Sequence, residues 1–344
     1  MLSWAFSRGR GAGGSEVDSL TGSQRRSTSL PMYSRAYYTP ARYKSLGGLC
    51  IPYRFAFCVL LLCCVVLVLF ATGFQAQVIP SPLHANPPLA FNYDGKASKA
   101  THLVIVAGHA VLNFASDLKR AASSDDAWHL LEYQKGSGLP EAILTHIKEG
   151  LKVAENDPSA LLVFSGGETR RDVGPISEGA SYYAVTDALS VWGDSNVRAR
   201  TITEEYATDS LQNLLFSICR FREITNSYPL RITVVSFSFK SNRFVNQHAR
   251  AILWPSNALS FIGVDPPTTS GFDLESASRG ERENSASAFE KDPYGCNSKQ
   301  LIDKRISRNP FSRSHNYATT CSEISGLLSY CGDLLYTDEL PWRT

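Results

Sequence analysis

Small and polar residues follow the apolar runs of this sequence, at the point where each run ends. If these runs are parallel strands, their carboxyl ends meet at one edge of a sheet, where α/β proteins bind their ligands. We therefore predict one ligand site at that edge. Its candidate residues are Gly108, His109, Ser165, Gly166, Gly167, Glu178, Asp209, Ser210, Gln212, Asn213, Ser236, Lys240 and Arg243.

The chemistry that these residue types favour is the binding of an anion. The glycines at 166–167 would let backbone N–H groups approach a negative charge. Lys240 and Arg243 would add positive charge for a phosphate or a carboxylate. Glu178 and His109 are the candidates for catalytic proton carriers. The remaining polar side chains would hydrogen-bond the ligand, and they include Asp209, Ser210, Gln212 and Asn213.

Several candidates also have a purely structural interpretation. Ser165 lacks the Gly-x-Ser-x-Gly pattern of a nucleophile, so it could simply occupy a tight turn. Gly108 is not part of a Gly-x-Gly-x-x-Gly motif, which argues against a dinucleotide fingerprint. His109 could be a hydrogen-bonded structural histidine, Glu178 a charge at a helix start, and the two cations solvated surface charges.

Alternating strands and helices must position these residues. The pattern is typical of an α/β domain of Rossmann-like, three-layer type with a mostly parallel sheet. Predicted strands are 102–107, 160–164, 231–237 and 259–263, with a short extended piece at 200–203. Predicted helices are 126–134, 139–155, 177–192, 208–223 and 241–253.

The domain should extend over residues 99–340, with a C-terminal extension from 264. Residues 264–298 are polar and form either a long surface loop or a helix at about 277–290, and 299–336 should be helical. Cys219 falls in a helical pattern and is predicted to be a core residue. The other cysteines of the domain could supply one disulfide if it faces an oxidising lumen, and they are Cys296, Cys321 and Cys331.

A hydrophobic segment at 55–74 predicts one transmembrane helix and makes the lipid bilayer a partner. Its twenty uncharged residues would span about 30 Å as a helix. Residues 1–54 are basic and predict a disordered cytosolic tail, while the proline-rich stretch 75–98 predicts a linker. The positive-inside rule then gives a single-pass, type II signal anchor with a lumenal domain in the endoplasmic reticulum or Golgi. A mitochondrial presequence before an inner-membrane span is the alternative.

Composition limits the other function classes. The formal net charge of +2 and the lack of a basic, aromatic-rich stripe argue against a nucleic-acid partner. No cysteine and histidine spacing suggests a zinc site. The sequence also has no Asn-x-Ser/Thr acceptor, which weakens the lumenal interpretation slightly.

The order of these motifs resembles the SanA-like family, known as domain of unknown function 218. The matching segments are 103–108, 164–167, 177–178, 209–213 and 235–243, within residues 100–262. The extension after 264 resembles one in fungal-type members. The resemblance implies a Rossmann-like, often membrane-anchored domain, with S-adenosylmethionine as a possible cofactor. Gln212 and Lys240 depart from the carboxylate and the imidazole that the family has there, which favours holding an anion over acid–base chemistry.

Three functions remain open at this stage. The chain could be a membrane-anchored enzyme acting on a phosphorylated, nucleotide-like or lipid-linked substrate. It could instead be a non-catalytic module that binds an anionic metabolite such as S-adenosylmethionine. A membrane-tethered structural or trafficking factor is the third possibility. All three functions place a site for a small anionic ligand, functional or vestigial, at the carboxyl edge of the predicted sheet.

Overall fold

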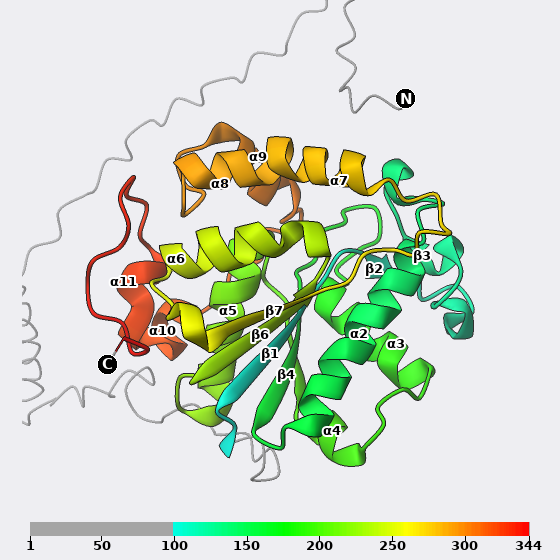
Figure 1. The fold of residues 1–344 in the computed structure, drawn as a ribbon, viewed down its shortest axis with the longest axis horizontal. Coiled ribbons are helices and arrows are strands. Elements are labelled where there is room, and N and C mark those ends of the chain that lie inside the picture. Colours follow the sequence, from blue (N-terminus) through cyan, green and yellow to red (C-terminus); the bar gives the residue numbers. More distant parts are fainter. Residues whose placement is uncertain (1–98, 344) are drawn as a thin grey trace, which may run out of the picture. The chain divides into compact units, whose positions relative to one another are not determined.

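The computed structural model describes residues 99–343, and it contains a five-stranded parallel sheet (Figure 1). The strand order is β5-β4-β1-β6-β7, which is the order of a doubly wound α/β sheet. The predicted α/β class with a mostly parallel sheet is therefore confirmed. The strands are β1 (His102–Ala107), β4 (Ala160–Ser165), β5 (Thr201–Glu204), β6 (Arg231–Ser236) and β7 (Leu259–Gly263).

Side chains of the central strands alternate between two apolar layers, because successive residues of a strand point to opposite faces. Leu103 and Ile105 of β1 belong to one buried cluster, which includes α5 (Ser210–Thr225) and α6 (Ala249–Ala251). Val104 and Val106 belong to the other, with α2 (Leu139–Asn156), α3 (Glu178–Ala188) and α4 (Ser195–Ala199). Figure 1 shows α2 and α3 on the opposite side of the sheet from α5 and α6. Continuous apolar strands are thus buried on both faces.

Two predicted helices have a different form in the structure. Residues 126–134 do not form one helix but the 3₁₀ turns η4 (Asp125–Ala127) and η5 (Glu132–Gln134), separated by β3 (Trp128–His129). Strand β3 pairs antiparallel with β2 (Val111–Leu112). Its Trp128 indole donates to the Ala121 carbonyl at 2.8 Å and is buried, so tertiary packing overrides the local pattern.

The predicted helix at 241–253 is wound differently from an α-helix over most of its length. It begins as the 3₁₀ turn η6 (Ser238–Lys240), continues as the π-helix η7 (Arg243–His248), and ends as α6. A second π-helical segment is η9 (Arg282–Ala286). Gln247 of η7 donates to the Ala286 carbonyl of η9 at 3.1 Å. Such wide turns are often found at functional sites.

The C-terminal extension is helical and packs onto the α5 side of the sheet, so the helical alternative for 264–298 is confirmed. Leu340 and Trp342 are buried in the same cluster as β1 and α5. Its helical elements are α7 (Leu274–Glu281), η9, α8 (Ser287–Lys291), α9 (Lys299–Ser307), α10 (Tyr317–Thr320), η10 (Ser322–Ile324) and α11 (Ser325–Leu328).

Two disulfides fasten this extension. Cys219 of α5 is bonded to Cys321, and Cys296 is bonded to Cys331. Cys219 is buried as predicted, but it is not a free core thiol, because its disulfide to Cys321 links α5 to the extension. The pairing accounts for all four cysteines of the described domain.

The predicted tail, membrane span and linker, at 1–54, 55–74 and 75–98, lie outside the described residues. Within residues 99–343, no helix has the length and apolar character needed to cross a bilayer.

Candidate functional site

The carboxyl ends of β4, β1 and β6 bring the predicted site residues to one edge of the sheet. The Gly108 amide, after β1, donates to the Ser165 carbonyl at the end of β4 at 2.7 Å. On the other side of β1, Ser236 ends β6, and its Oγ lies 3.3 Å from Nε2 of His109. The connections after β1 and β4 run over one face of the sheet and the connection after β6 over the other. The edge between β1 and β6 is therefore the topological switch point, where this architecture binds ligands.

Glu178 is seated between two glycines of this edge. A Cβ on Gly108 would lie 2.6 Å from the Glu178 Cβ, and a Cβ on Gly166 would lie 2.7 Å from it. Ser177 caps the start of α3 by accepting from the Ala180 amide, which fixes where the helix begins. The Glu178 carboxylate is buried and accepts a hydrogen bond from Thr169 Oγ1 at 2.7 Å. The glycines thus make room for a carboxylate at the switch point.

The same glycines do not offer free amides to an anion, which corrects the role expected of them. Gly108 donates to the Ser165 carbonyl, Gly166 to the Glu204 carbonyl at 2.9 Å, and Gly167 to the Ala207 carbonyl at 2.8 Å. Because each N–H group already has a backbone acceptor, anion binding at this edge must come from side chains.

His109 and Lys240 form a hydrogen-bonded pair at the end of β6. The Lys240 Nζ lies 3.2 Å from Nδ1 of His109. An ammonium can only donate, so Nδ1 accepts and the proton of the ring lies on Nε2, facing Ser236. Burial, followed by the charge of Lys240, holds the pKa of His109 well below its ordinary value. Burial and the Arg243 guanidinium lower the pKa of Lys240 to about 7.

Ser165 and Asn213 belong to a buried polar network that also includes Glu204, a residue that the sequence analysis did not single out. Ser165 Oγ donates to Glu204 Oε2 at 2.7 Å and accepts from Asn213 Nδ2 at 2.9 Å. Burial raises the pKa of Glu204 to about 7, against the opposing hydrogen bonds from Ser165 and the amides of Tyr206 and Ala207. These three side chains bind one another rather than facing outward.

The other polar residues of segment 209–213 also have partners within the fold. Asp209 caps α5 by accepting from the Gln212 amide, and its second oxygen accepts from Arg305 Nε at 2.6 Å. Ser210 Oγ lies 2.6 Å from Nε2 of buried His248. The Gln212 side chain accepts from the backbone and the hydroxyl of Thr208. Gln212 and Ser210 therefore stabilise the start of α5, while Asp209 connects the core to the extension.

The extension supplies cations to this edge that the sequence analysis did not assign to the site. Arg308 donates to the Thr208 carbonyl at 3.2 Å, and Arg313 pairs with buried Glu168. Arg305 contacts Asp209, and Lys304 donates to Ser285 at 2.8 Å. The one available signal was the density of basic residues between 304 and 313. The partners of the three arginines lie 96 to 145 positions away, which no local pattern reports.

We call Lys240, Arg243, Lys304, Arg305 and Arg308 the cation cluster. Their charges act on one another, on His109 and on three carboxylates, which are Glu178, Asp209 and Glu281. Arg243 is 5% exposed and lies 3.2 Å from Glu281, but its Nε has no hydrogen-bond partner. When both lysines are protonated, the five positive charges of these groups exceed their three negative charges by two.

Burial and the excess of positive charge lower the pKa values of the two lysines of the cluster. Burial, then Arg308 and Arg243, lower the pKa of Lys304 well below its ordinary value, as burial and Arg243 do for Lys240. Lowered lysine pKa values mean that the folded protein resists holding all of these protons. An anion placed among the cluster would relieve this repulsion.

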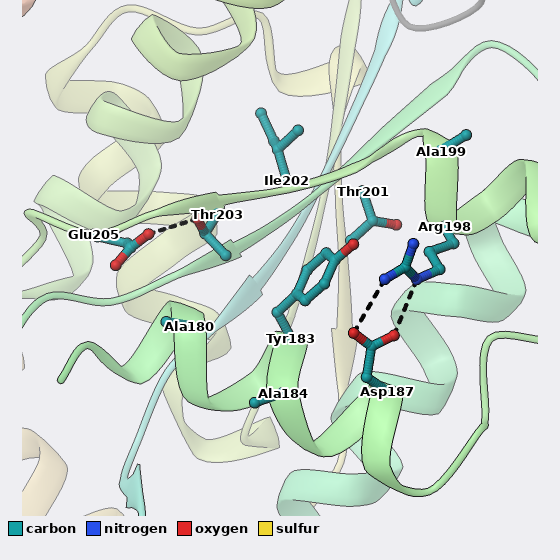
Figure 2. A pocket seen from close by; sticks show the side chains of 10 residues that line it. All are labelled: Ala180, Tyr183, Ala184, Asp187, Arg198, Ala199, Thr201, Ile202, Thr203 and Glu205. Carbon is teal, nitrogen blue, oxygen red and sulfur yellow. Dashed lines mark hydrogen bonds and ion pairs between the residues drawn. The ribbon is translucent and has the colours of Figure 1, made fainter. Parts of the chain in front are cut away.

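A separate groove of about 640 Å³ lies along the free edge of β5 (Figure 2). One face of α3, with Ala180, Tyr183 and Asp187, forms one wall, and Thr201 and Thr203 of β5 form the other. In Figure 2 the Arg198 guanidinium meets the Asp187 carboxylate, with contacts of 3.0 and 3.2 Å. None of the predicted site residues lines this groove.

Neither a metal nor S-adenosylmethionine is suggested by these side chains. Within the described part of the chain, no group of three or more His, Cys, Asp or Glu side chains could hold a metal ion. S-adenosylmethionine carries a sulfonium and an ammonium against one carboxylate, so it is a net cation and its description as an anionic metabolite was wrong. An excess of positive charge at the switch point would repel it. The residues at this edge therefore do not fit that cofactor.

The chain is similar to a yeast protein. “Uncharacterized protein YOR238W” of Saccharomyces cerevisiae (strain ATCC 204508 / S288c) is 29% identical over 232 residues, which cover 56% of this chain and 76% of the yeast protein. No protein family model matches the chain, and no solved structure gives a significant match. The resemblance to domain of unknown function 218 stays a prediction, and function must be argued from the geometry.

Proposed function

We propose that the cation cluster binds a small dianionic ligand of phosphate type at the switch point between β1 and β6. The observation that carries this proposal is the clustering of the half-buried Lys240 and Arg308 around buried Arg243, whose Nε has no hydrogen-bond partner. Burying uncompensated charge is costly, so a fold tolerates such a cluster where an anion completes it. The unpartnered Nε of Arg243 adds a donor for the same ligand.

A catalytic role is the second candidate, and Glu178 is the observation that favours it. Its carboxylate is held by Thr169 at the edge of β1 and β4, while Lys240 lies over the adjoining edge of β6. A general base must lie within hydrogen-bond reach of the proton that it takes, and Glu178 would do so for a group next to an anion bound at Lys240. Glu178 would accept the proton of a hydroxyl or a water next to the bound anion. His109 would orient Lys240 by accepting its hydrogen bond.

Calorimetric titration of the full-length chain with inorganic phosphate and with sulfate tests the binding proposal. We expect one site, with Arg308→Ala weakening binding by roughly tenfold to a hundredfold, because a charge-assisted hydrogen bond is worth about 1.5–3 kcal/mol. Arg250→Ala is the matched control, since Arg250 is exposed on α6 outside the cation cluster. Unchanged affinity in Arg308→Ala, or no binding in the unchanged protein, contradicts the proposal.

Glu178→Gln separates the two candidates. A binder keeps or gains affinity for the anion when this carboxylate loses its charge. An enzyme loses turnover of a phosphate ester while still binding it. Retained folding is checked by the thermal midpoint of both proteins.

We also propose that residues 55–74 anchor this domain in a membrane, with the domain on an oxidising side. The uncharged apolar run supports the anchor. The two disulfides of the domain support an oxidising compartment such as the lumen of the endoplasmic reticulum. Carbonate extraction should leave the chain in the membrane pellet, and protease added to sealed vesicles should spare the domain. Release by carbonate contradicts the anchor.

A further inference from the structure

A column of four aromatic rings runs beside the cation cluster. His109 stacks on Phe237, with centroids 4.4 Å apart and planes at 25°. Phe237 stacks on Phe239 at 5.1 Å and 9°, and Phe239 on Phe272 at 6.1 Å and 27°. The four rings come from the segment after β1, the segment after β6, and the loop before α7. The column therefore joins the switch point to the extension.

The charged group and the rings are in contact. Lys240 Nζ lies 5.0 Å from the centre of the Phe237 ring and 5.9 Å from that of Phe239, within the range of a cation–π interaction. Lys240 also bonds to His109 at the inner end of the column. An anion bound by Lys240 would accordingly lie next to this aromatic wall.

Exposure increases from Phe237 to the outer two rings of the column. Phe237 is 6% exposed, whereas Phe239 and Phe272 are only half-buried. Phe272 follows Gly271, where a Cβ would lie 2.9 Å from the Gly136 carbonyl, so the backbone passes close to the segment before α2. The outer rings thus lead from the half-buried Lys240 toward solvent and leave aromatic surface for a partner.

We infer that the ligand carries a planar aromatic ring next to its anionic group, as a nucleoside monophosphate does. This inference rests on the proposed function, because it concerns the organic part of the same ligand. Near-parallel rings present flat faces, and a further flat ring extends such a stack favourably. An acyl chain needs only apolar area, which leucine would supply as well as phenylalanine.

The groove along β5 offers no comparable combination. Its arginine, Arg198, is already bound in two-point contact by Asp187, and its remaining charged residue, Glu205, is a carboxylate, which would repel an anion. It contains one aromatic wall residue, Tyr183, rather than a stack that leads to a cation. The aromatic column is therefore the better site for a ligand that joins a ring to an anion.

Phe272→Leu and Phe239→Leu test the inference in the full-length chain. The probes are adenosine 5′-monophosphate, inorganic phosphate and n-octyl phosphate, titrated by calorimetry. Phe114→Leu is the matched control, because Phe114 is 47% exposed and outside the column. We expect the nucleotide to bind roughly tenfold or more tighter than phosphate, since stacking on one base is worth about that much. Phe272→Leu should remove most of this advantage and leave phosphate affinity unchanged.

The contrary outcomes are distinct. Equal affinity for the nucleotide and phosphate overturns the aromatic inference and leaves anion binding intact. Tighter binding of octyl phosphate that survives Phe272→Leu and Phe239→Leu also overturns it, in favour of an aliphatic ligand. No binding of any of the three probes to the unchanged protein contradicts the proposed function itself.

Discussion

The side-chain nitrogen of Lys240 lies 3.2 Å from Nδ1 of His109, so the protonation of the lysine decides which of the two groups donates. While Lys240 is an ammonium, neutral His109 accepts at Nδ1 and its ring proton lies on Nε2, facing Ser236. Lys240 must donate, yet burial and Arg243 bring its pKa down to about 7. The pair is therefore balanced near neutral pH, where a nearby anion would favour the charged lysine.

Anion affinity should fall as pH rises through 7. An anion stabilises protonated Lys240, and the fraction of protonated Lys240 in the free protein decreases above its pKa of about 7. Between pH 6 and pH 8 the affinity should drop about tenfold. Sulfate is the probe for this titration, because it keeps its two charges across the range whereas phosphate does not.

Lys240→Met should weaken sulfate binding at pH 6 and remove most of this pH dependence. His109 does not replace the effect, since its lowered pKa keeps it neutral over the whole range. Other charged groups that act on Lys240 come from separate elements and remain in the variant, and they are Glu178, Arg243, Glu281 and Arg308. An unchanged pH profile in Lys240→Met would assign the titration to another group.

Glu204→Gln should stabilise the protein more at pH 8 than at pH 4. The pKa of Glu204 is raised from 4.5 to about 7 in the folded state, chiefly by burial. Below pH 4.5 the carboxyl is neutral in both the folded and the unfolded protein. As pH rises from 4.5 through 7, it ionises more readily in the unfolded chain, so the free energy of unfolding falls. The cost at pH 8 is on the order of 3 kcal/mol. Chemical denaturation at both pH values measures this difference in the free energy of unfolding. Glu205→Gln is the control, because Glu205 is the neighbouring residue and is only half-buried.

Gly179→Ala should destabilise the fold, and Gly280→Ala should not. A Cβ on Gly179 would lie 2.6 Å from the Phe164 carbonyl oxygen and 2.9 Å from that of Glu204, so α3 would have to move away from the sheet. Overpacking of this kind costs about 1–3 kcal/mol. Gly280 in α7 meets only the Asn284 side chain at 3.8 Å, and alanine favours a helix by about 1 kcal/mol. Equal denaturation midpoints for the two variants would show that α3 does not pack this closely.

The two disulfides should differ in their contribution to stability. Cys219 and Cys321 close a loop with a sequence separation of 102, against 35 for Cys296 and Cys331. Loop entropy predicts that removing the longer link costs about 1 kcal/mol more. Paired Cys→Ala variants, compared by chemical denaturation, measure the difference. Mass spectrometry of the unreduced chain should first find both cross-links, and free thiols at these four positions would refute the pairing.

The strands could be predicted from the sequence because they are buried on both faces. The apolar runs at 102–107 and 160–164 match β1 and β4 to within a residue, and the pattern at 139–155 matches α2. The turns between them could not be predicted as well. In 126–134 the local pattern suggests a helix, but burial of Trp128 and pairing with β2 decide the structure.

The candidate site could be predicted in part for a similar reason. Residues that follow strands meet at the switch point because the sheet is parallel, and His109, Glu178 and Lys240 do so. Their partners could not be foreseen, since Arg305 reaches Asp209 across 96 positions and Arg308 reaches Thr208 across 100. The glycine amides were expected to face a ligand, but the hydrogen bonds between the strands continue past β1 and β4 and pair the Gly108 and Gly166 amides with carbonyls.

Crystals of the protein grown with selenate or tungstate would locate the anion most directly, through the anomalous signal of the heavy atom. The account predicts one strong peak at the carboxyl ends of β1 and β6, within hydrogen-bond distance of Lys240 and of Arg243 or Arg308. A peak confined to the exposed Arg198 of the β5 groove, or no peak at the switch point, would contradict it.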